Sequence, residues 1–182
     1  MKNPSGNHLY FIGITPDNSA SQQLKSYQLA LFEKYDCKHA LKSPPHLTLV
    51  PPFALAAEQE PSLILDLETM PQSFSSLKII ISGIKSFDKR VIYAAPIVTE
   101  SLQKLQQEIF TYFGKYVSGK VRAQFMFTPH FTIANRDIRV EDFPDIMAYL
   151  QSQSIEFQAS LDKIHLFKFQ QGKWHSLSHQ SG

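Results

Sequence analysis

A four-residue pattern of histidine, apolar residue, threonine and apolar residue occurs twice in this chain, and it restricts the fold more than any other feature. The copies are His46-Leu47-Thr48-Leu49 and His130-Phe131-Thr132-Ile133, and each directly follows a proline. Alternate side chains of a β-strand project from the same face of its sheet. Each copy therefore predicts a strand whose His and Thr share one face while the apolar residues anchor the other.

The order of predicted elements also repeats. Hydrophobic periodicity and turn residues give each half of the chain the order strand, helix, motif strand, helix, strand. We expect strands over residues 9–14, 46–50, 77–87, 91–98, 125–134, 155–169 and 173–177, and helices over residues 19–35, 61–70, 99–116 and 141–151. Pro51-Pro52 should end the first motif strand. The tail, residues 178–182, reads as a frayed end.

Two such halves, approximately residues 8–90 and 91–178, would be related by an approximate two-fold axis that brings the motif strands together at a central cleft. No linker rich in Gly and Ser separates them, because the strand from Val91 follows directly on the hairpin turn Asp88-Lys89-Arg90. We therefore expect one bilobal α+β domain over residues 1–182. Its two pseudo-two-fold related lobes should be rich in antiparallel strands and carry their helices outside.

Composition excludes several functional classes. Hydrophobic residues make up 43% of the chain and charged residues 19%, as in ordinary globular proteins. A formal charge of +2 is compatible with an anionic ligand but too small for a nucleic-acid coat. The single cysteine, Cys37, allows no intrachain disulfide. Because we find neither a long apolar run nor a signal-peptide pattern at the start, we expect a cytoplasmic protein without membrane attachment, and a monomer.

The two histidines suit acid–base chemistry at one substrate, since the unperturbed pKa of histidine, about 6.5, lies near working pH. Thr48 and Thr132 would project beside them and donate hydroxyl hydrogen bonds. Metal-binding histidine pairs typically show i, i+4 spacing on a helix or accompany Cys, Asp or Glu ligands, so we expect no metal and no other cofactor. The alternative is that His46 and His130 are half-buried structural residues and that the threonines merely favour strands.

The paired motifs resemble those of the two-histidine (2H) phosphoesterases, the superfamily of 2′-5′ RNA ligases and RNA 2′,3′-cyclic phosphodiesterases. Three further stretches are similar to this superfamily: the opening strand from His8 to Pro16, the second motif strand from Thr128 to Ala134, and the closing hairpin Ile164-His165-Leu166-Phe167-Lys168 with Gly172-Lys173-Trp174 behind it. The chain departs from the usual pattern at Asn135, which stands where Arg is common. This departure leaves the identity of the substrate open.

The resemblance implies that the protein opens 2′,3′-cyclic phosphates, at RNA ends or in small nucleotides, without a metal ion. Because the superfamily contains 2′-5′ RNA ligases, ligase activity is a second expectation. His46 and His130 would act as acid and base, and Thr48 and Thr132 would bind phosphoryl oxygens. A non-catalytic RNA- or nucleotide-binding protein of the same fold is the main alternative, and a structural or interaction module is another.

Four further residues are candidates for substrate binding. Arg136 and Lys168 are candidates for phosphate contacts, and Tyr10 or Phe11 for stacking on a base. Ordinary surface charge and core packing are the alternatives for these four residues. His165 also lies in a strand-like segment, but it lacks a Thr two positions later, so we expect a structural role for it.

Overall fold

The computed structural model describes residues 6–70 and 76–181. Residues 1–5 and Gly182 lie outside this description. The first five residues include much of the start that we read as lacking a signal peptide, and Gly182 belongs to the expected frayed tail. The strands are β1 (Asn7–Pro16), β2 (Leu47–Ala56), β3 (Leu77–Phe87), β4 (Val91–Pro96), β5 (Phe131–Asn135), β6 (Glu156–Gln170) and β7 (Lys173–Ser181). The α-helices are α1 (Asn18–Tyr35), α2 (Glu60–Thr69), α3 (Glu100–Phe113), α4 (Gly119–Gln124) and α5 (Phe143–Ser152), with 3₁₀ turns at Ala40–Lys42, Ala57–Gln59 and Gly114–Tyr116.

The strands form one antiparallel sheet in the order β2-β1-β6-β3-β4-β5, with β7 paired to β6. The long strand β6 takes part in both halves of this sheet. Its C-terminal part pairs with β1 and β7, whereas its N-terminal part pairs with β3, and Leu161 pairs with Pro16 on one side and Leu77 on the other. We call β2, β1, β7 and the C-terminal part of β6 the first lobe, and the remaining strands the second lobe.

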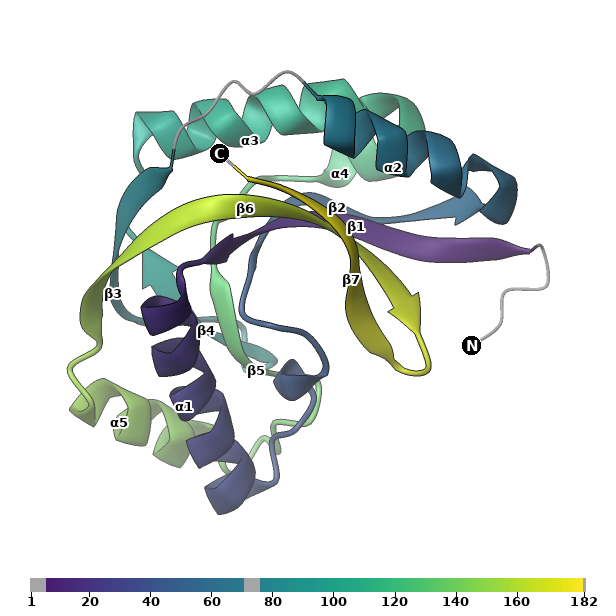
Figure 1. Cartoon of the computed structure of the whole chain (residues 1–182). Helices are drawn as coiled ribbons and strands as arrows, with labels where there is room; N and C mark the ends of the chain where they lie inside the picture. Colours follow the sequence, from purple (N-terminus) through teal and green to yellow (C-terminus); the bar gives the residue numbers. More distant parts are fainter. Residues whose placement is uncertain (1–5, 71–75, 182) are drawn as a thin grey trace.

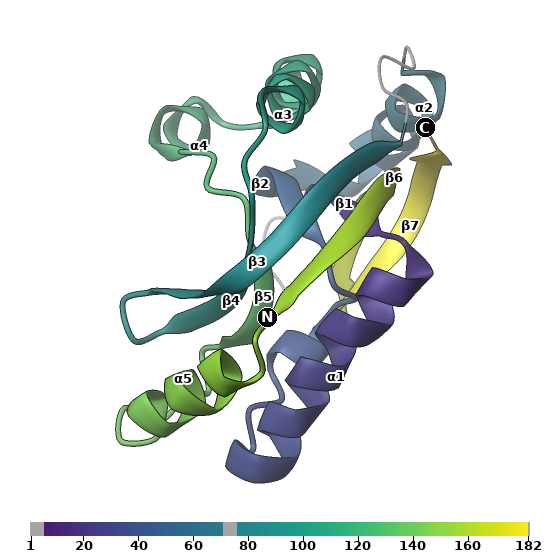
Figure 2. The ribbon, with the colours of Figure 1, turned by 90° about the vertical axis from the view of Figure 1, so that its left-hand side faces the viewer.

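Helices lie on both sides of the strands. Figures 1 and 2 show α2 and α3 along one side of the molecule and α1 and α5 along the other. The expected α+β architecture of antiparallel lobes with outer helices is confirmed. The two motif strands, β2 and β5, stand at opposite ends of the path of paired strands.

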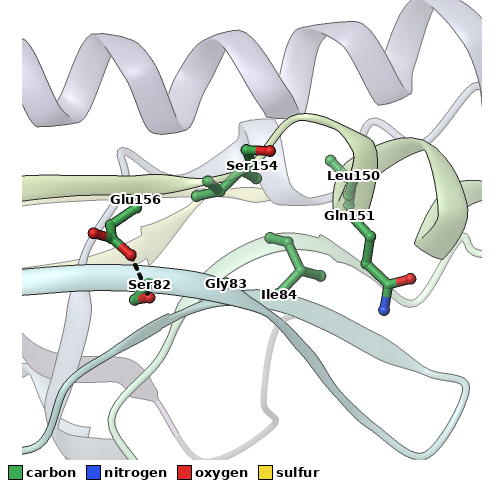
Figure 3. A pocket seen from close by; sticks show the side chains of 8 residues that line it. Ser82, Gly83, Ile84, Leu150, Gln151, Ser154 and Glu156 are labelled. Carbon is green, nitrogen blue, oxygen red and sulfur yellow. Dashed lines mark hydrogen bonds between the residues drawn. The ribbon is translucent and has the colours of Figure 1, made fainter.

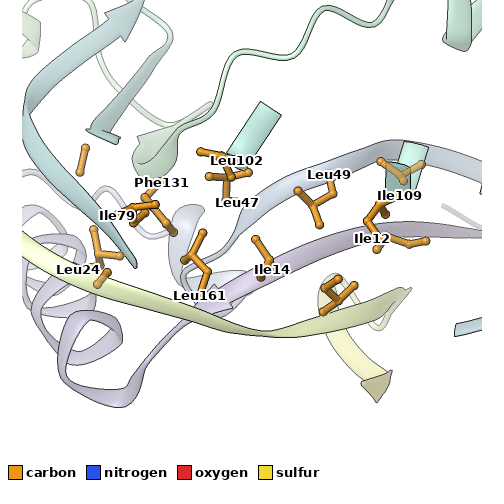
Figure 4. Close-up of a cluster of buried hydrophobic side chains, with 14 of the residues drawn as sticks. Ile12, Ile14, Leu24, Leu47, Leu49, Ile79, Leu102, Ile109, Phe131 and Leu161 are labelled. Carbon is orange, nitrogen blue, oxygen red and sulfur yellow. The ribbon is translucent and has the colours of Figure 1, made fainter. Parts of the chain in front are cut away.

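The apolar residues of both halves build one hydrophobic core. In Figure 4 side chains of β1 and β2 lie among those of α1, α3, β3, β5 and β6. Leu47 and Phe131, the second residues of the two motifs, are both fully buried. Burying an aliphatic or aromatic side chain of this size contributes about 1.5–3 kcal/mol. The apolar positions of the motifs therefore fix the two motif strands, as their alternation predicts.

Three expectations about the strands were wrong. Pro51-Pro52 does not end the first motif strand, because β2 continues to Ala56. β2 is an edge strand, and its pairing with β1 shifts register between Tyr10 and Ile12, opposite the two prolines. A missing backbone N–H costs little at such a place. The second motif strand is shorter than expected, since residues 125–130, between α4 and β5, have no regular secondary structure. The tail is not frayed, because β7 pairs with β6 as far as Ser181.

Among the described residues, no helix is long and apolar enough to cross a membrane.

Candidate active site

His46 stands directly before β2 and packs against two aromatic rings of the first lobe. Its ring centroid lies 4.7 Å from that of Phe11 and 5.5 Å from that of Phe167. Its Nδ1 atom lies 2.8 Å from the carbonyl oxygen of Pro44. The ring is thus fixed by two packed neighbours and by the backbone of the turn that leads into the strand.

His130 repeats this environment in the second lobe. It stands directly before β5, and its ring centroid lies 5.1 Å from that of Phe87 and 5.4 Å from that of Tyr93. Its Nδ1 atom lies 2.7 Å from the carbonyl oxygen of Thr128, again two residues before the histidine. The pseudo-two-fold relation between the halves therefore extends to the hydrogen bond and the aromatic packing of each imidazole.

These hydrogen bonds determine which ring nitrogen is free. A carbonyl oxygen only accepts, so Nδ1 of each histidine must carry the hydrogen and donate it to Pro44 or Thr128. In the neutral imidazole Nε2 is then the basic nitrogen. Both histidines therefore present Nε2 as the atom able to take up or give a proton.

Burial lowers the pKa of both histidines. The pKa of His46 falls to about 4, because burial disfavours its charged form and a proton on His130 lowers it further, against the effect of the Pro44 carbonyl. Burial also lowers the pKa of His130, and the Thr128 carbonyl opposes this.

Each motif threonine is half-buried beside its histidine. Thr48 pairs with Gly13 of β1, and Gly13 is also the neighbour of the His46 ring. Thr132 pairs with Tyr93 of β4, whose ring packs against His130. Paired residues project from the same face of a sheet, so each threonine shares a face with its own histidine, as the motif predicts. We call this side of each lobe its motif face.

Gly13 makes room for the His46 imidazole. A Cβ atom at this position would lie 3.3 Å from Cδ2 of His46, 3.1 Å from the carbonyl oxygen of Leu47 and 3.0 Å from Cε2 of Phe11. No side chain fits there without moving His46, Phe11 or the backbone of β2. The sequence carried a signal for this, because a glycine inside a strand often marks a close approach of another group.

Two buried glutamines hold the motif strands from the opposite half of the chain. Nε2 of Gln28 in α1 donates to the carbonyl oxygen of Thr132 at 2.8 Å, and Nε2 of Gln106 in α3 donates to that of Leu49 at 3.1 Å. Each helix thus packs against the motif strand of the other half. We did not single out either glutamine from the sequence.

A signal for these glutamines was nevertheless present. Leu24, Gln28 and Leu31 follow the same spacing as Leu102, Gln106 and Ile109, and in both helices the three residues are buried. A polar residue in the middle of the apolar stripe of a helix needs a hydrogen-bond partner in the core. The pattern repeats in the two halves just as the histidine motif does.

The other candidate residues lie in different places. Phe11 supports the His46 ring. Tyr10 and Lys168 lie on the opposite face of the sheet, where Oη of Tyr10 donates to Glu60 at 2.5 Å and Nζ of Lys168 forms an ion pair with the same carboxylate. Tyr10 and Lys168 therefore join the first lobe to α2. Arg136 follows β5 directly, is exposed and has a left-handed backbone (φ 65°).

A hollow of about 390 Å³ lies away from both motifs, between β3 and the turn that leads from α5 into β6. Figure 3 shows Ser82 hydrogen-bonded to Glu156 at its edge. The hollow contains no histidine and belongs to neither motif face. Within residues 6–70 and 76–181, no three His, Cys, Asp or Glu side chains are grouped to hold a metal ion.

Comparison with known proteins assigns the family. The family model described as the 2′-5′ RNA ligase superfamily matches residues 15–173. The chain belongs to this superfamily. A relative from Geobacillus sp. strain WCH70, provisionally named a phosphoesterase, is 26% identical over 170 residues, which is 91% of each chain. Another from Geobacillus kaustophilus, with the same provisional name, is 27% identical over 168 residues and also covers 91% of each chain.

Solved structures share the fold of this superfamily member. The crystal structure of Escherichia coli LigT complexed with 3′-AMP superposes with a TM-score of 0.61 at 16% identity, and the match covers 96% of this chain and 98% of LigT. The crystal structure of TT0787 from Thermus thermophilus superposes with a TM-score of 0.67 at 13% identity, over 95% of this chain and 97% of its own. At such low identity these structures support the fold alone.

Proposed function

We propose that this protein is a metal-independent phosphoesterase that opens 2′,3′-cyclic phosphates, at RNA ends or in small nucleotides, with His46 and His130 as base and acid. The observation that carries the proposal is the duplicated environment of the two imidazoles. Each has Nδ1 bonded to a carbonyl two residues earlier, each packs on two aromatic rings, and each shares a face with a half-buried threonine. The superfamily and the provisional names of the relatives support the same class of reaction.

The pKa of each histidine suggests how the two roles are divided. We assign His46 as the base, because burial lowers its pKa to about 4 and so keeps it neutral at working pH, and we assign His130 as the acid. Neutral His46 then accepts a proton at Nε2 from the attacking water. His130 delivers a proton from Nε2 to the departing ribose oxygen.

The reaction that follows is an in-line displacement at phosphorus. The oxygen of water forms a bond to phosphorus, a ribose oxygen leaves, and the ring of the cyclic phosphate opens. Negative charge grows on the non-bridging oxygens, where hydroxyl groups of Thr48 and Thr132 can donate hydrogen bonds. An incoming ribose hydroxyl in place of water would join two nucleotides, which is the ligase form of the same chemistry.

Turnover of a 2′,3′-cyclic nucleotide in the presence of excess chelator tests this proposal, with the position of the product phosphate read by NMR. A panel that includes 2′-5′-linked dinucleotides separates hydrolysis of cyclic phosphates from ligase chemistry. We expect turnover to survive the chelator. Activity that is lost with the chelator and restored by a divalent cation contradicts the proposed mechanism. Binding without turnover favours a non-catalytic nucleotide-binding protein instead.

A further inference from the structure

A second polar cluster lies on the motif face of the first lobe, next to His46. Gly13 pairs with Thr48 on one side and with His165 on the other, and His165 pairs in turn with His179 of β7. Cross-strand partners project from the same face of a sheet. Thr48, His165 and His179 therefore lie in one row, and only a glycine separates the motif threonine from His165.

His165 is held between two hydroxyl groups. Its Nε2 atom lies 3.1 Å from Oγ1 of Thr15, and its Nδ1 atom lies 2.9 Å from Oγ of Ser176. A neutral imidazole has one donor and one acceptor nitrogen, so one of the two hydroxyls must accept a hydrogen bond from the ring. That hydroxyl keeps its own hydrogen for another acceptor. In either tautomer the cluster has a donor to offer to a ligand.

Lys163, the cross-strand partner of Thr15, supplies positive charge beside this cluster. Burial, followed by the charges of His179, Lys163 and His46, lowers the pKa of His165 to about 4. Lys163 and His179 are both exposed, and within the described residues neither has an ion pair or a side-chain hydrogen bond. The neighbouring carboxylate Glu68 bonds Ser178 on the other face of β7. A hydroxyl donor beside the Lys163 ammonium favours an anion with several acceptor oxygens.

We propose that Thr15, Lys163, His165, Ser176 and His179 form a subsite for a second phosphoryl group of the substrate, one that does not react. This inference rests on the proposed function, since it describes a substrate that carries a further phosphate beside the cyclic one. That phosphate is either the 5′-phosphate of a mononucleotide or the next phosphodiester of an RNA chain. The subsite would extend the row from Thr48 across β6 to β7, strands that lie side by side in the first lobe (Figure 1).

Kinetics on three substrates test the subsite and identify the source of the phosphate. The substrates are a 2′,3′-cyclic nucleoside phosphate, the same compound with a 5′-phosphate, and a dinucleotide that ends in a 2′,3′-cyclic phosphate. We expect kcat/KM to be about tenfold or more higher for at least one of the last two, as for a charge-assisted contact. The compound with the higher kcat/KM shows whether the second phosphate is a 5′-phosphate or the next phosphodiester of an RNA chain. Equal kcat/KM for all three overturns the proposal.

Matched variants on the two faces of β6 and β7 show which face is responsible for the preference for a second phosphate. Lys163→Gln and His179→Ala should each remove most of the preference for the second phosphate and leave kcat/KM for the simple cyclic compound within about twofold. Lys173→Gln and His175→Ala, whose cross-strand partners lie on the opposite face, should leave the preference unchanged. A preference that persists in both Lys163→Gln and His179→Ala overturns the assignment to this cluster.

A binding measurement separates failure of the subsite from failure of the proposed function. If the wild-type protein turns over none of the three substrates, the proposed function is wrong, and the subsite is judged by binding alone. Inorganic phosphate is then titrated into the His46→Ala/His130→Ala variant while the imidazole resonances of His165 and His179 are followed by NMR. Saturable shifts that disappear when Lys163→Gln is added support the subsite, and unchanged resonances overturn it.

Discussion

At the scale of single residues, the site depends on two histidines whose surroundings match. The motif predicts the histidines and threonines, because alternation in a strand is a local property. The hydrogen bonds from Nδ1 to the carbonyl groups of Pro44 and Thr128 were not predictable, since they depend on the backbone path before each strand. The packing of Phe11 and Phe167 on His46 also joins strands far apart in sequence.

The pH dependence of kcat/KM should be bell-shaped with its maximum on the acid side of pH 6.5. Burial lowers the pKa of both histidines below the ordinary value of 6.5, to about 4 for His46. Below the pKa of His46 the base is protonated, and above the pKa of His130 the acid has lost its proton, so the rate falls in both directions. A pH series of initial rates at low substrate checks this. A maximum above about pH 7.5 contradicts the lowered pKa values of the two histidines.

Gly13→Ala should reduce turnover by about ten- to hundredfold, because the added methyl group displaces the His46 ring or the β2 backbone from its productive position. Gly119→Ala is the control, since a Cβ atom there meets nothing within 4 Å. Steady-state rates and thermal melting of both variants distinguish displacement of His46 from loss of fold. Wild-type turnover in a folded Gly13→Ala variant would show that the close approach has no catalytic consequence.

At the scale of elements, each motif strand is supported by a helix from the other half of the chain. The sequence predicts the helices α1 and α3, because their apolar residues recur at helical spacing. It does not reveal that Gln28 reaches Thr132 and that Gln106 reaches Leu49, since the exchange of helices between halves is a tertiary feature. The continuation of β2 through Pro51-Pro52 was also missed. Proline is tolerated within a strand at a sheet edge or a bulge, and the position of a strand in its sheet is a tertiary feature.

Gln106→Leu should lower the free energy of unfolding by about 1–3 kcal/mol, because the buried carbonyl of Leu49 loses its hydrogen-bond donor. Gln107→Leu is the matched control, as Gln107 is exposed on the same helix. Urea unfolding of the two variants compares them directly. Equal stability of the two variants would mean that this hydrogen bond contributes nothing to the free energy of unfolding.

At the scale of the whole molecule, β6 links the two lobes, because it pairs with β1 and β7 along one part and with β3 along the other. The order of strands, helices and motifs predicts two related halves. It does not predict that one strand would be shared between them, since pairing partners over such distances are not encoded locally. The proposal that residues 1–182 form one bilobal domain follows from this shared strand and the common core.

A single domain of this kind should unfold in one cooperative transition. Differential scanning calorimetry should give one peak whose calorimetric and van't Hoff enthalpies agree. The reason is that the lobes share β6 and that α1 and α3 each contact the motif strand of the other half. Two separated transitions would show that the halves are independent folding units.

Loss of turnover in the histidine variants tests the central claim most directly. His46→Ala and His130→Ala should each reduce turnover of a 2′,3′-cyclic nucleotide by about two to four powers of ten, the usual contribution of a general acid or base. The double variant should be little slower than either single variant, because the two groups act as a unit. If His130→Ala instead destabilised the fold while turnover per folded molecule stayed at the wild-type level, His130 would be a core residue and the two-histidine mechanism would be wrong.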